Sequence, residues 1–279
     1  MHRTNLKTLM LFLVLISISL GLIACRKEPQ AQTPPASPAL PVVSASARPS
    51  TEPEPAPQST VHETLPIPTA PQQETEPQVI PDAPTVSMDD ALLIGDSRTV
   101  GLWDYAKLDG ADYFADVGAS VYNIHKLTVS VPSVGRVTLK ELLQHKQYGK
   151  IYLMLGVNEA GYEVQQTAGK FRELVDEIQR LQPEAVLFLQ SNLHVTKERS
   201  DRDAVINNPA IDSINFEVSR MADWKTRFYL DCNALFDDEN GGLSKELTGD
   251  DTHLYAKHYE RWAKWIVWKT AKLQEEYAF

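Results

Sequence analysis

From residue 88 to the end of the chain, short apolar runs alternate with longer segments whose apolar residues recur at helical spacing. The short runs predict strands at residues 91–94, 113–117, 151–155, 185–190 and 227–231. The longer segments predict helices at residues 98–107, 137–145, 167–181, 211–225 and from 255 onward. Strands that alternate with helices through right-handed crossovers form a parallel sheet covered on both faces. The pattern therefore predicts an α/β fold, a three-layer α/β/α sandwich around a five-stranded parallel sheet.

The last predicted helix carries an apolar stripe that contains aromatic residues. The stripe consists of Tyr255, Tyr259, Trp262, Ile266 and Leu273. Such a stripe at helical spacing is typical of a helix that packs on a core. We therefore interpret its aromatic residues as core packing against the sheet, and not as a platform that stacks on a ligand.

The first 25 residues have the pattern of an export signal and not of a folded element. Arg3 and Lys7 precede an apolar run of residues 9–24. This run is short of the ~18–20 residues that comfortably span a bilayer. Its end, Leu-Ile-Ala-Cys25, resembles a bacterial lipobox, which predicts lipidation of Cys25 and a membrane anchor. An ordinary cleaved signal and an uncleaved anchor are the alternatives, and all three predict an exported protein.

Residues 26–87 differ from the rest of the chain in composition. The segment holds 15 of the 18 prolines and has no glycine and no aromatic residue. Such a composition buries too little apolar surface to offset the entropy of ordering the chain. It predicts a disordered, semi-extended linker between the anchor and a domain at 88–279. A proline-rich motif that binds a partner is the alternative.

Composition also excludes several classes of function. A net charge of −10 gives no electrostatic basis for nucleic-acid binding. The sequence has no glycine-rich phosphate loop and no His/Cys cluster at metal-ligand spacing, so no cofactor or metal is expected. Once Cys25 is assigned to the anchor, Cys232 is the one remaining cysteine, and we expect it to be a small buried core residue.

Polar and glycine residues follow every predicted strand. Because the carboxyl ends of parallel strands meet at one edge, these residues should surround one crevice. In chain order they are Gly95-Asp96-Ser97, Gly118, Gly156-Val157-Asn158, Ser191-Asn192-Leu193-His194 and Asp250-Asp251-Thr252-His253. Taken alone, Asp96-Ser97 is also an ordinary helix cap. Five such coincidences at one edge favour a functional site.

These blocks resemble the signature of the SGNH (GDSL) hydrolase family, and the match covers about residues 92–258. The resemblance implies that the fold is flavodoxin-like and that Ser97 is the nucleophile. It also implies that Asp250 and His253, in an Asp-x-x-His block, complete a catalytic triad. Gly118 and Asn158 match the family's second and third blocks. The backbone N–H groups of Ser97 and Gly118 and the Asn158 amide would then form the oxyanion hole.

The chemistry of these residue types agrees with the resemblance. A serine hydroxyl becomes a good nucleophile when a base such as His253 takes its proton. Asp250 can hold the imidazole in one tautomer, and the amide of Asn158 can donate to an oxyanion.

The sequence departs from the family pattern at two places. Asp251 stands where a glycine is frequent, and no clear match to the fourth block appears at residues 192–194. These departures leave the acyl specificity open, and we expect the polar segment 196–210 to influence it. Near the blocks, Arg98 is expected to form a structural ion pair, Glu159 to brace its loop, and His194 is a candidate to line the crevice.

Three functions are compatible with the sequence. The leading hypothesis is an exported ester hydrolase that works through an acyl-serine, with short acyl groups such as O-acetyl on cell-envelope or environmental glycans as its substrate. The second is an O-acyltransferase, in which a sugar hydroxyl replaces water as the acceptor. The third is a catalytically idle surface-binding module. The complete set of Ser97, Asp250 and His253 argues against the third hypothesis.

Overall fold

The computed structural model describes residue 80 and residues 86–279. The predicted signal peptide (1–25), the lipidation site Cys25 and nearly all of the predicted linker (26–87) lie outside the described residues. The domain boundaries at 25 and 87 therefore stay predictions.

Five parallel strands form the central sheet, as the sequence predicted. They are β1 (Ala91–Gly95), β2 (Asp112–Ala115), β5 (Lys150–Met154), β6 (Val186–Gln190) and β7 (Arg227–Leu230). Their order is β2-β1-β5-β6-β7, the flavodoxin-like arrangement. Gly95 lies opposite both Ala115 and Met154, so the carboxyl ends of the first three strands are level. The loops that follow them therefore meet at one edge.

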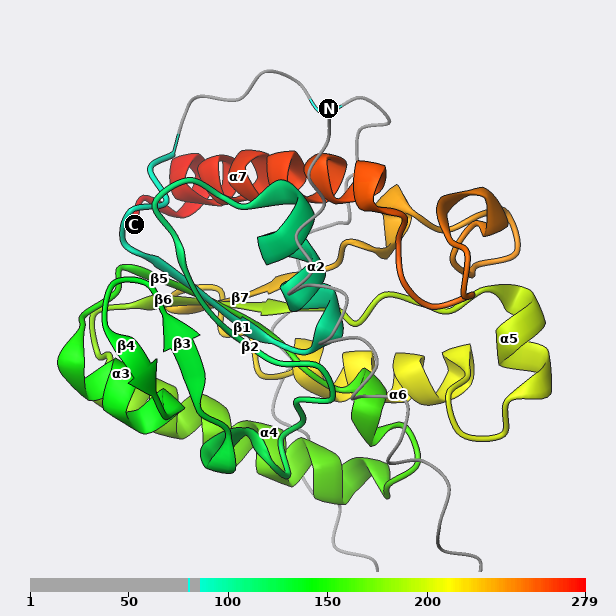
Figure 1. Ribbon diagram of the computed structural model, residues 1–279, viewed down its shortest axis with the longest axis horizontal. Helices are drawn as coiled ribbons and strands as arrows, with labels where there is room; N and C mark the ends of the chain where they lie inside the picture. The colour runs from blue at the N-terminus through cyan, green and yellow to red at the C-terminus, as the bar shows by residue number, and fades with distance from the viewer. Residues whose placement is uncertain (1–79, 81–85) are drawn as a thin grey trace, which may run out of the picture. The chain divides into compact units, whose positions relative to one another are not determined.

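Helices cover both faces of the sheet, which confirms the three-layer sandwich (Figure 1). The helices α2 (Ser97–Ala106) and α7 (Ala256–Tyr277) pack on one face, where Leu93 and the fully buried Trp262 belong to one core cluster. The other face carries α3 (Leu139–His145), α4 (Val164–Leu181) and α6 (Asn208–Ser219). Leu92 and Ile94 belong to the core cluster on this second face, together with buried residues of these three helices. The strand β1 is therefore buried on both sides.

Two segments fold differently from their prediction. Residues 137–145 were expected to be one helix, but Val137 ends a hairpin of β3 (Val129–Val131) and β4 (Gly135–Val137). The helix α3 begins only after Thr138, whose side chain forms a capping box with Glu141. This cap satisfies backbone groups that a longer helix would have paired internally, and so it fixes the helix start.

The segment after β6 also differs from its prediction. It contains a short helix that the sequence did not indicate, α5 (Lys197–Arg202). The next helix, α6, begins after the cap residue Asn207 and ends at Ser219, well before the predicted end at residue 225. Four 3₁₀ turns complete the described elements: η1 (Ile124–Lys126), η2 (Val157–Glu159), η3 (Asn233–Leu235) and η4 (Lys245–Leu247).

The aromatic stripe of α7 is confirmed as core packing, with one exception. Tyr259, Trp262, Ile266 and Leu273 are buried, whereas Tyr255 precedes the helix and is 47% exposed. Cys232 is fully buried, and burial raises the pKa of its thiol to about 12, as expected for an inert core cysteine. Within the described part of the chain, no helix is both long and apolar enough to cross a membrane.

Candidate active site

Ser97 is the first residue of α2 and follows directly on the buried strand β1. Asp96 is the N-cap of this helix, because its Oδ1 accepts a hydrogen bond from the backbone N–H of Arg98 at 2.9 Å. The capping interpretation therefore holds for Asp96, and it leaves the hydroxyl of Ser97 available for other contacts. At the first turn of a helix the backbone N–H groups have no partner within the helix.

Ser97, His253 and Asp250 form one hydrogen-bonded chain. Ser97 Oγ lies 2.9 Å from His253 Nε2, and His253 Nδ1 lies 2.7 Å from Asp250 Oδ2. An ionised carboxylate only accepts hydrogen bonds, so Nδ1 is the donor to Asp250. In the neutral imidazole Nε2 is then the acceptor, which is the tautomer that can take a proton from Ser97.

Asp250 is also held by backbone donors. Its Oδ1 accepts from the backbone N–H groups of His253 at 2.8 Å and Thr252 at 3.0 Å. Partial burial raises the pKa of Asp250, but these hydrogen bonds and the ring of His253 outweigh it, so the pKa lies below its ordinary value. The carboxylate is therefore ionised whenever His253 is required to act as a base.

Gly118 and Asn158 lie on the two loops that follow β2 and β5. Gly118 has φ +79°, a conformation that favours glycine, and its carbonyl accepts from Asn123 Nδ2 at 3.0 Å. Asn158 Nδ2 donates to the carbonyl of Ala119 at 2.9 Å. A side-chain amide has two N–H bonds, so this contact fixes the amide and leaves its second N–H as a donor. The structure thus joins the two loops next to Gly118.

Gly156 is required by a close approach to the loop after β6. It has φ +139°, and a Cβ atom built on it would lie 2.5 Å from Asn192 Nδ2. Asn192 Oδ1 accepts from the backbone N–H of Val157 at 3.1 Å, and Nδ2 donates to the carbonyl of Leu155 at 3.0 Å. Asn192, which matched no family block, therefore supports the backbone on both sides of Gly156.

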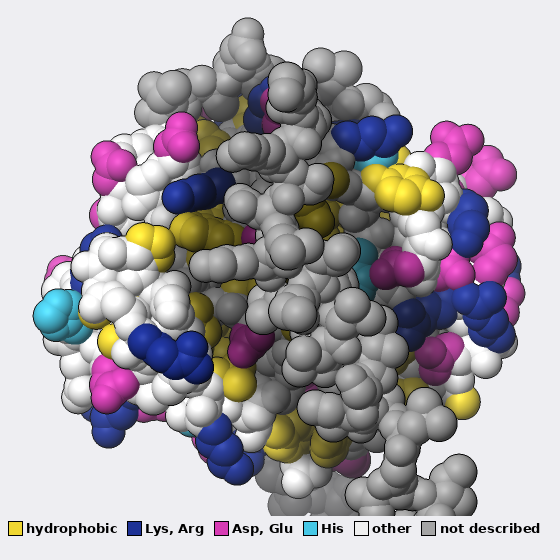
Figure 2. All heavy atoms as spheres, viewed as in Figure 1, with side chains coloured by type: hydrophobic (Ala, Val, Ile, Leu, Met, Phe, Trp, Pro, Cys, Tyr) yellow, Lys and Arg dark blue, Asp and Glu magenta, His cyan; other side chains and the backbone are white. Residues whose placement is uncertain are grey.

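The segment 196–210 contacts the loop that carries Asp250 and His253. Arg202 Nη2 of α5 lies 2.7 Å from Asp251 Oδ2, and Lys245 pairs with the other carboxylate oxygen. Arg199 donates to the hydroxyl of Thr252. Basic and acidic side chains are accordingly intermingled over the α5 end of the molecule (right side of Figure 2). Sequence reasoning missed this role because it requires the position of α5.

Asp251 explains one departure from the family pattern. It has φ +67°, the left-handed conformation that glycine adopts at no steric cost, and it is 7% exposed. Aspartate tolerates this conformation better than most residues do. The Arg202 and Lys245 contacts hold its side chain in place.

Arg98 was expected to form an ion pair and Glu159 to brace its loop, and the two expectations have different outcomes. Arg98 is buried, and among residues 86–279 no carboxylate lies within 4.0 Å of its guanidinium, so the expected close ion pair is absent. The charge of Asp96 still acts on Arg98, because it opposes the lowering of the Arg98 pKa by burial. Arg98 Nη2 lies 3.4 Å from the carbonyl of Thr252, the residue before His253. Glu159 braces its loop as expected, because its Oε1 accepts from the backbone N–H of Val121 at 2.6 Å. Burial raises the pKa of Glu159 to about 7.

His194 is clamped between two carboxylates. Its Nδ1 lies 2.7 Å from Asp237 Oδ2, and its Nε2 lies 2.8 Å from Asp212 Oδ1. Burial lowers the pKa of His194, but hydrogen bonds and charges from Asp237 and Asp212 outweigh it and raise the pKa to about 9. With both ring nitrogens occupied, His194 has a structural role and does not offer a group to the crevice.

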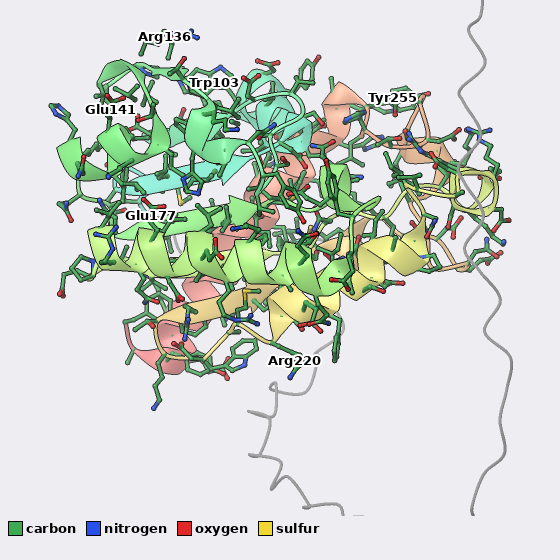
Figure 3. The ribbon with its side chains drawn as sticks, turned by 90° about the horizontal axis from the view of Figure 1, so that it is seen from below. Trp103, Arg136, Glu141, Glu177, Arg220 and Tyr255 are labelled. Atoms are coloured by element: carbon green, nitrogen blue, oxygen red, sulfur yellow. The ribbon has the colours of Figure 1, made fainter. Side chains whose placement is uncertain are left out.

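The candidate site is open to solvent. The side chain of His253 is 39% exposed and that of Asp250 is 58% exposed. Tyr255, two residues after His253, lies at the end of the molecule opposite Glu141 (Figure 3). In residues 86–279 no group of three or more His, Cys, Asp or Glu side chains is placed to hold a metal ion.

The parallel sheet carries the Ser97-His253-Asp250 chain of hydrogen bonds at its carboxyl edge. The chain belongs to the GDSL-like lipase/acylhydrolase family, whose sequence profile matches residues 93–261. This confirms the predicted resemblance and makes the protein an ester-cleaving hydrolase by family. The comparison with curated proteins gives no match.

Solved structures share the fold at low sequence identity. A provisionally assigned acylhydrolase from Bacteroides fragilis is 15% identical, with a TM-score of 0.50 over 70% of this chain and 90% of that chain. A GDSL-like lipase from Bacteroides thetaiotaomicron is 15% identical, with a TM-score of 0.49 over 68% of this chain and 91% of that one. A carbohydrate esterase of family 3 from Talaromyces cellulolyticus is 16% identical, with a TM-score of 0.46 over 67% and 98% of the two chains.

Proposed function

We propose that this protein is an exported serine esterase that removes short acyl groups, such as O-acetyl, from glycans. The observation that carries the proposal is the chain of hydrogen bonds from Ser97 Oγ through His253 to Asp250, at 2.9 and 2.7 Å. Gly118 and Asn158 lie on the loops that follow β2 and β5, the two neighbours of β1 in the sheet.

The reaction would have two steps. Ser97 Oγ attacks the ester carbonyl carbon while His253 Nε2 takes the hydroxyl proton, and the resulting oxyanion receives hydrogen bonds from the N–H groups of Ser97 and Gly118 and from Asn158. The C–O bond to the alcohol breaks, and His253 returns the proton to that oxygen. Water then attacks the acyl-serine by the same route, which releases the acid and restores Ser97. Asp250 stabilises the imidazolium in both steps.

The exposure of the candidate triad supports a polar substrate, because the side chains of Asp250 and His253 face solvent.

The test of this function is hydrolysis of p-nitrophenyl esters with acetyl to decanoyl chains. We expect the highest kcat/KM with the acetyl ester. Ser97→Ala should lower kcat by several orders of magnitude, because the members of a triad act as a unit. Equal turnover after Ser97 is replaced would refute the mechanism, whereas preference for decanoyl would refute only the acyl size.

Hydrolase and acyltransferase use the same triad, so the acceptor must be measured. Acetyl transfer from p-nitrophenyl acetate to added oligosaccharide is followed by mass spectrometry. We propose water as the acceptor, because the site is open to bulk solvent. Acetylated oligosaccharide as the main product would overturn this choice.

We further propose that the protein is anchored to the membrane through a lipid on Cys25 and a linker at 26–87. Diacylation gives stable attachment, whereas one chain is marginal. Metabolic labelling with a fatty-acid analogue should mark the full chain, and Cys25→Ala should abolish the label while Cys232→Ala leaves it unchanged. A Cys25→Ala variant that still labels would contradict the anchor.

A further inference from the structure

Several large exposed apolar side chains lie in the segments that follow the strands of the sheet. Residues 86–279 contain six such side chains. Two are on helices, and the other four lie in segments that each follow a different strand: Val117, Tyr162, Val205 and Tyr255. Of these, Val205 lies against Gly161, the residue before Tyr162, and adjacent exposed apolar groups mark a binding surface more often than scattered ones do.

Tyr162 belongs to the loops that hold the oxyanion donors. Its backbone N–H donates to the carbonyl of Glu159 at 2.8 Å, and Glu159 in turn accepts from Val121. Val121 lies on the segment that follows β2, and the next residue on that segment is Tyr122. The two loops are therefore joined at three successive places: Asn158 to Ala119, Glu159 to Val121 and Tyr162 to Tyr122.

The rings of Tyr122 and Tyr162 are stacked, and only the ring of Tyr162 is exposed to solvent. Their centroids are 4.5 Å apart with 28° between the ring planes. Tyr122 packs against the core, and its hydroxyl lies 3.1 Å from Thr167 Oγ1. Tyr162 is 57% exposed. Tyr122 thus fixes the orientation of the Tyr162 ring before any ligand binds, which lowers the entropy cost of binding.

The surroundings of Tyr162 indicate what kind of group it binds. Val205, which is 50% exposed, approaches Gly161 so closely that a Cβ there would lie 2.9 Å from its Cγ1. The apolar surface is therefore one ring with an aliphatic neighbour, while Glu163 and the exposed Asn158 beside it are polar. A pyranose ring has a matching form, because its C–H face is apolar and its rim carries hydroxyl groups.

We propose that Tyr162, supported by Tyr122, is a stacking subsite for the sugar ring of the ester substrate. This inference rests on the proposed esterase function and adds its specificity determinant. Tyr162 is a binding residue in this assignment and takes no part in bond making. A ring bound there would present its ester next to the loops of Gly118 and Asn158.

The test compares two acetyl esters on three variants. We expect Tyr162→Ala to raise KM for O-acetylated xylo- and chito-oligosaccharides about tenfold, which corresponds to about 1.4 kcal/mol of lost binding, because the variant removes the ring on which the sugar would stack. Its kcat/KM for p-nitrophenyl acetate, which has no sugar ring to stack, should fall by a clearly smaller factor than its kcat/KM for the oligosaccharides. Tyr162→Phe keeps the ring and should behave as the unaltered protein. Tyr105→Ala is the matched control, because Tyr105 is 58% exposed and packs on another tyrosine, Tyr259.

A second measurement does not depend on turnover. Binding of the same oligosaccharides to the Ser97→Ala protein is measured by calorimetry, with and without Tyr162→Ala. A Kd that rises about tenfold supports the subsite even if no esterase activity is found. Unchanged oligosaccharide binding, or a loss confined to long-chain esters, overturns it, and hydrolysis of p-nitrophenyl acetate would show in that case that the esterase function still stands.

Discussion

Arg202 on α5 lies 2.7 Å from the carboxylate of Asp251, the residue that follows Asp250 in the loop of the candidate triad. Because Asp251 has φ +67°, this contact anchors the loop at its least favourable backbone conformation. The backbone N–H of Thr196 also donates to the carbonyl of Asp251 at 3.0 Å. The position of His253 therefore depends on a helix that the sequence did not reveal.

Replacing Asp251 separates the effect of the backbone conformation from that of the ion pairs. Asp251→Gly and Asp251→Ala both remove the carboxylate, but only alanine meets the left-handed penalty. We expect Asp251→Ala to be less stable than Asp251→Gly by on the order of 1 kcal/mol, and to have the lower kcat. Urea unfolding and hydrolysis of p-nitrophenyl acetate measure both effects. Equal losses would mean that the ion pairs alone hold the loop.

Asn158 should contribute to the rate and little to stability, since it is exposed. Asn158→Ala removes one of the three proposed oxyanion donors and should lower kcat about 10²–10³-fold. Asn158→Asp keeps the shape of the side chain but cannot donate, so it should lose at least as much. Asn240→Asp, in an exposed turn, is the control for an added charge. A kcat for Asn158→Ala within threefold of the original would remove Asn158 from the oxyanion hole.

Glu159 should make stability depend on pH between about 4.5 and 7. Burial raises its pKa to about 7, while the unfolded chain has the ordinary value near 4.5. In this range the folded state binds the additional proton, so its contribution favours folding at low pH and is lost as pH rises. The unfolding free energy of Glu159→Gln, relative to the original protein, should therefore increase from pH 5 to pH 8.

Two further results complete the test of Glu159. Glu159→Ala leaves the buried N–H of Val121 without its acceptor and should cost about 1–3 kcal/mol at either pH. Urea unfolding at the two pH values measures all three proteins. Parallel pH profiles for the original protein and Glu159→Gln would contradict the raised pKa.

His194 should also make stability depend on pH, but as a base, and over a higher pH range than Glu159. Its pKa of about 9 exceeds the unfolded value near 6.5, so its stabilising contribution is complete below pH 6.5 and is lost as pH rises through 9. His194→Gln should destabilise the protein by on the order of 1–2 kcal/mol at pH 6, a figure that allows for the exposure of Asp212, and by less at pH 9.5. His125→Gln is the control, since His125 is 49% exposed and pairs with Glu177 at 3.5 Å. A pH-independent loss would indicate that His194 contributes through packing alone.

The sequence predicted the sheet and its layers because strands buried on both faces appear as short apolar runs. The β1 segment, residues 91–95, is buried throughout, and such runs between amphipathic segments have few alternative folds. The blocks around Ser97, Asn158 and His253 could be placed at one edge for the same reason, since parallel strands fix where their following loops lie.

What the sequence could not predict depends on contacts between distant loops. The spacing of residues 196–210 shows only a polar segment, and the helix α5 in it is too short to have a clear apolar period. Arg98 was expected to find a carboxylate, but its contact is the carbonyl of Thr252, a group that every residue carries and no sequence pattern can single out. The two partners of His194 lie 18 and 43 positions away along the chain.

The exposure of His253 and Asp250 has a consequence for how a polymer could meet the proposed site. A triad enclosed in a tunnel accepts only the end of a chain, which must be threaded through it. Here the side chain of His253 is 39% exposed. If the proposed glycan substrate is a polymer, the site would meet an ester group from the side at any position along the polymer, without threading a chain end and without cutting the polymer backbone.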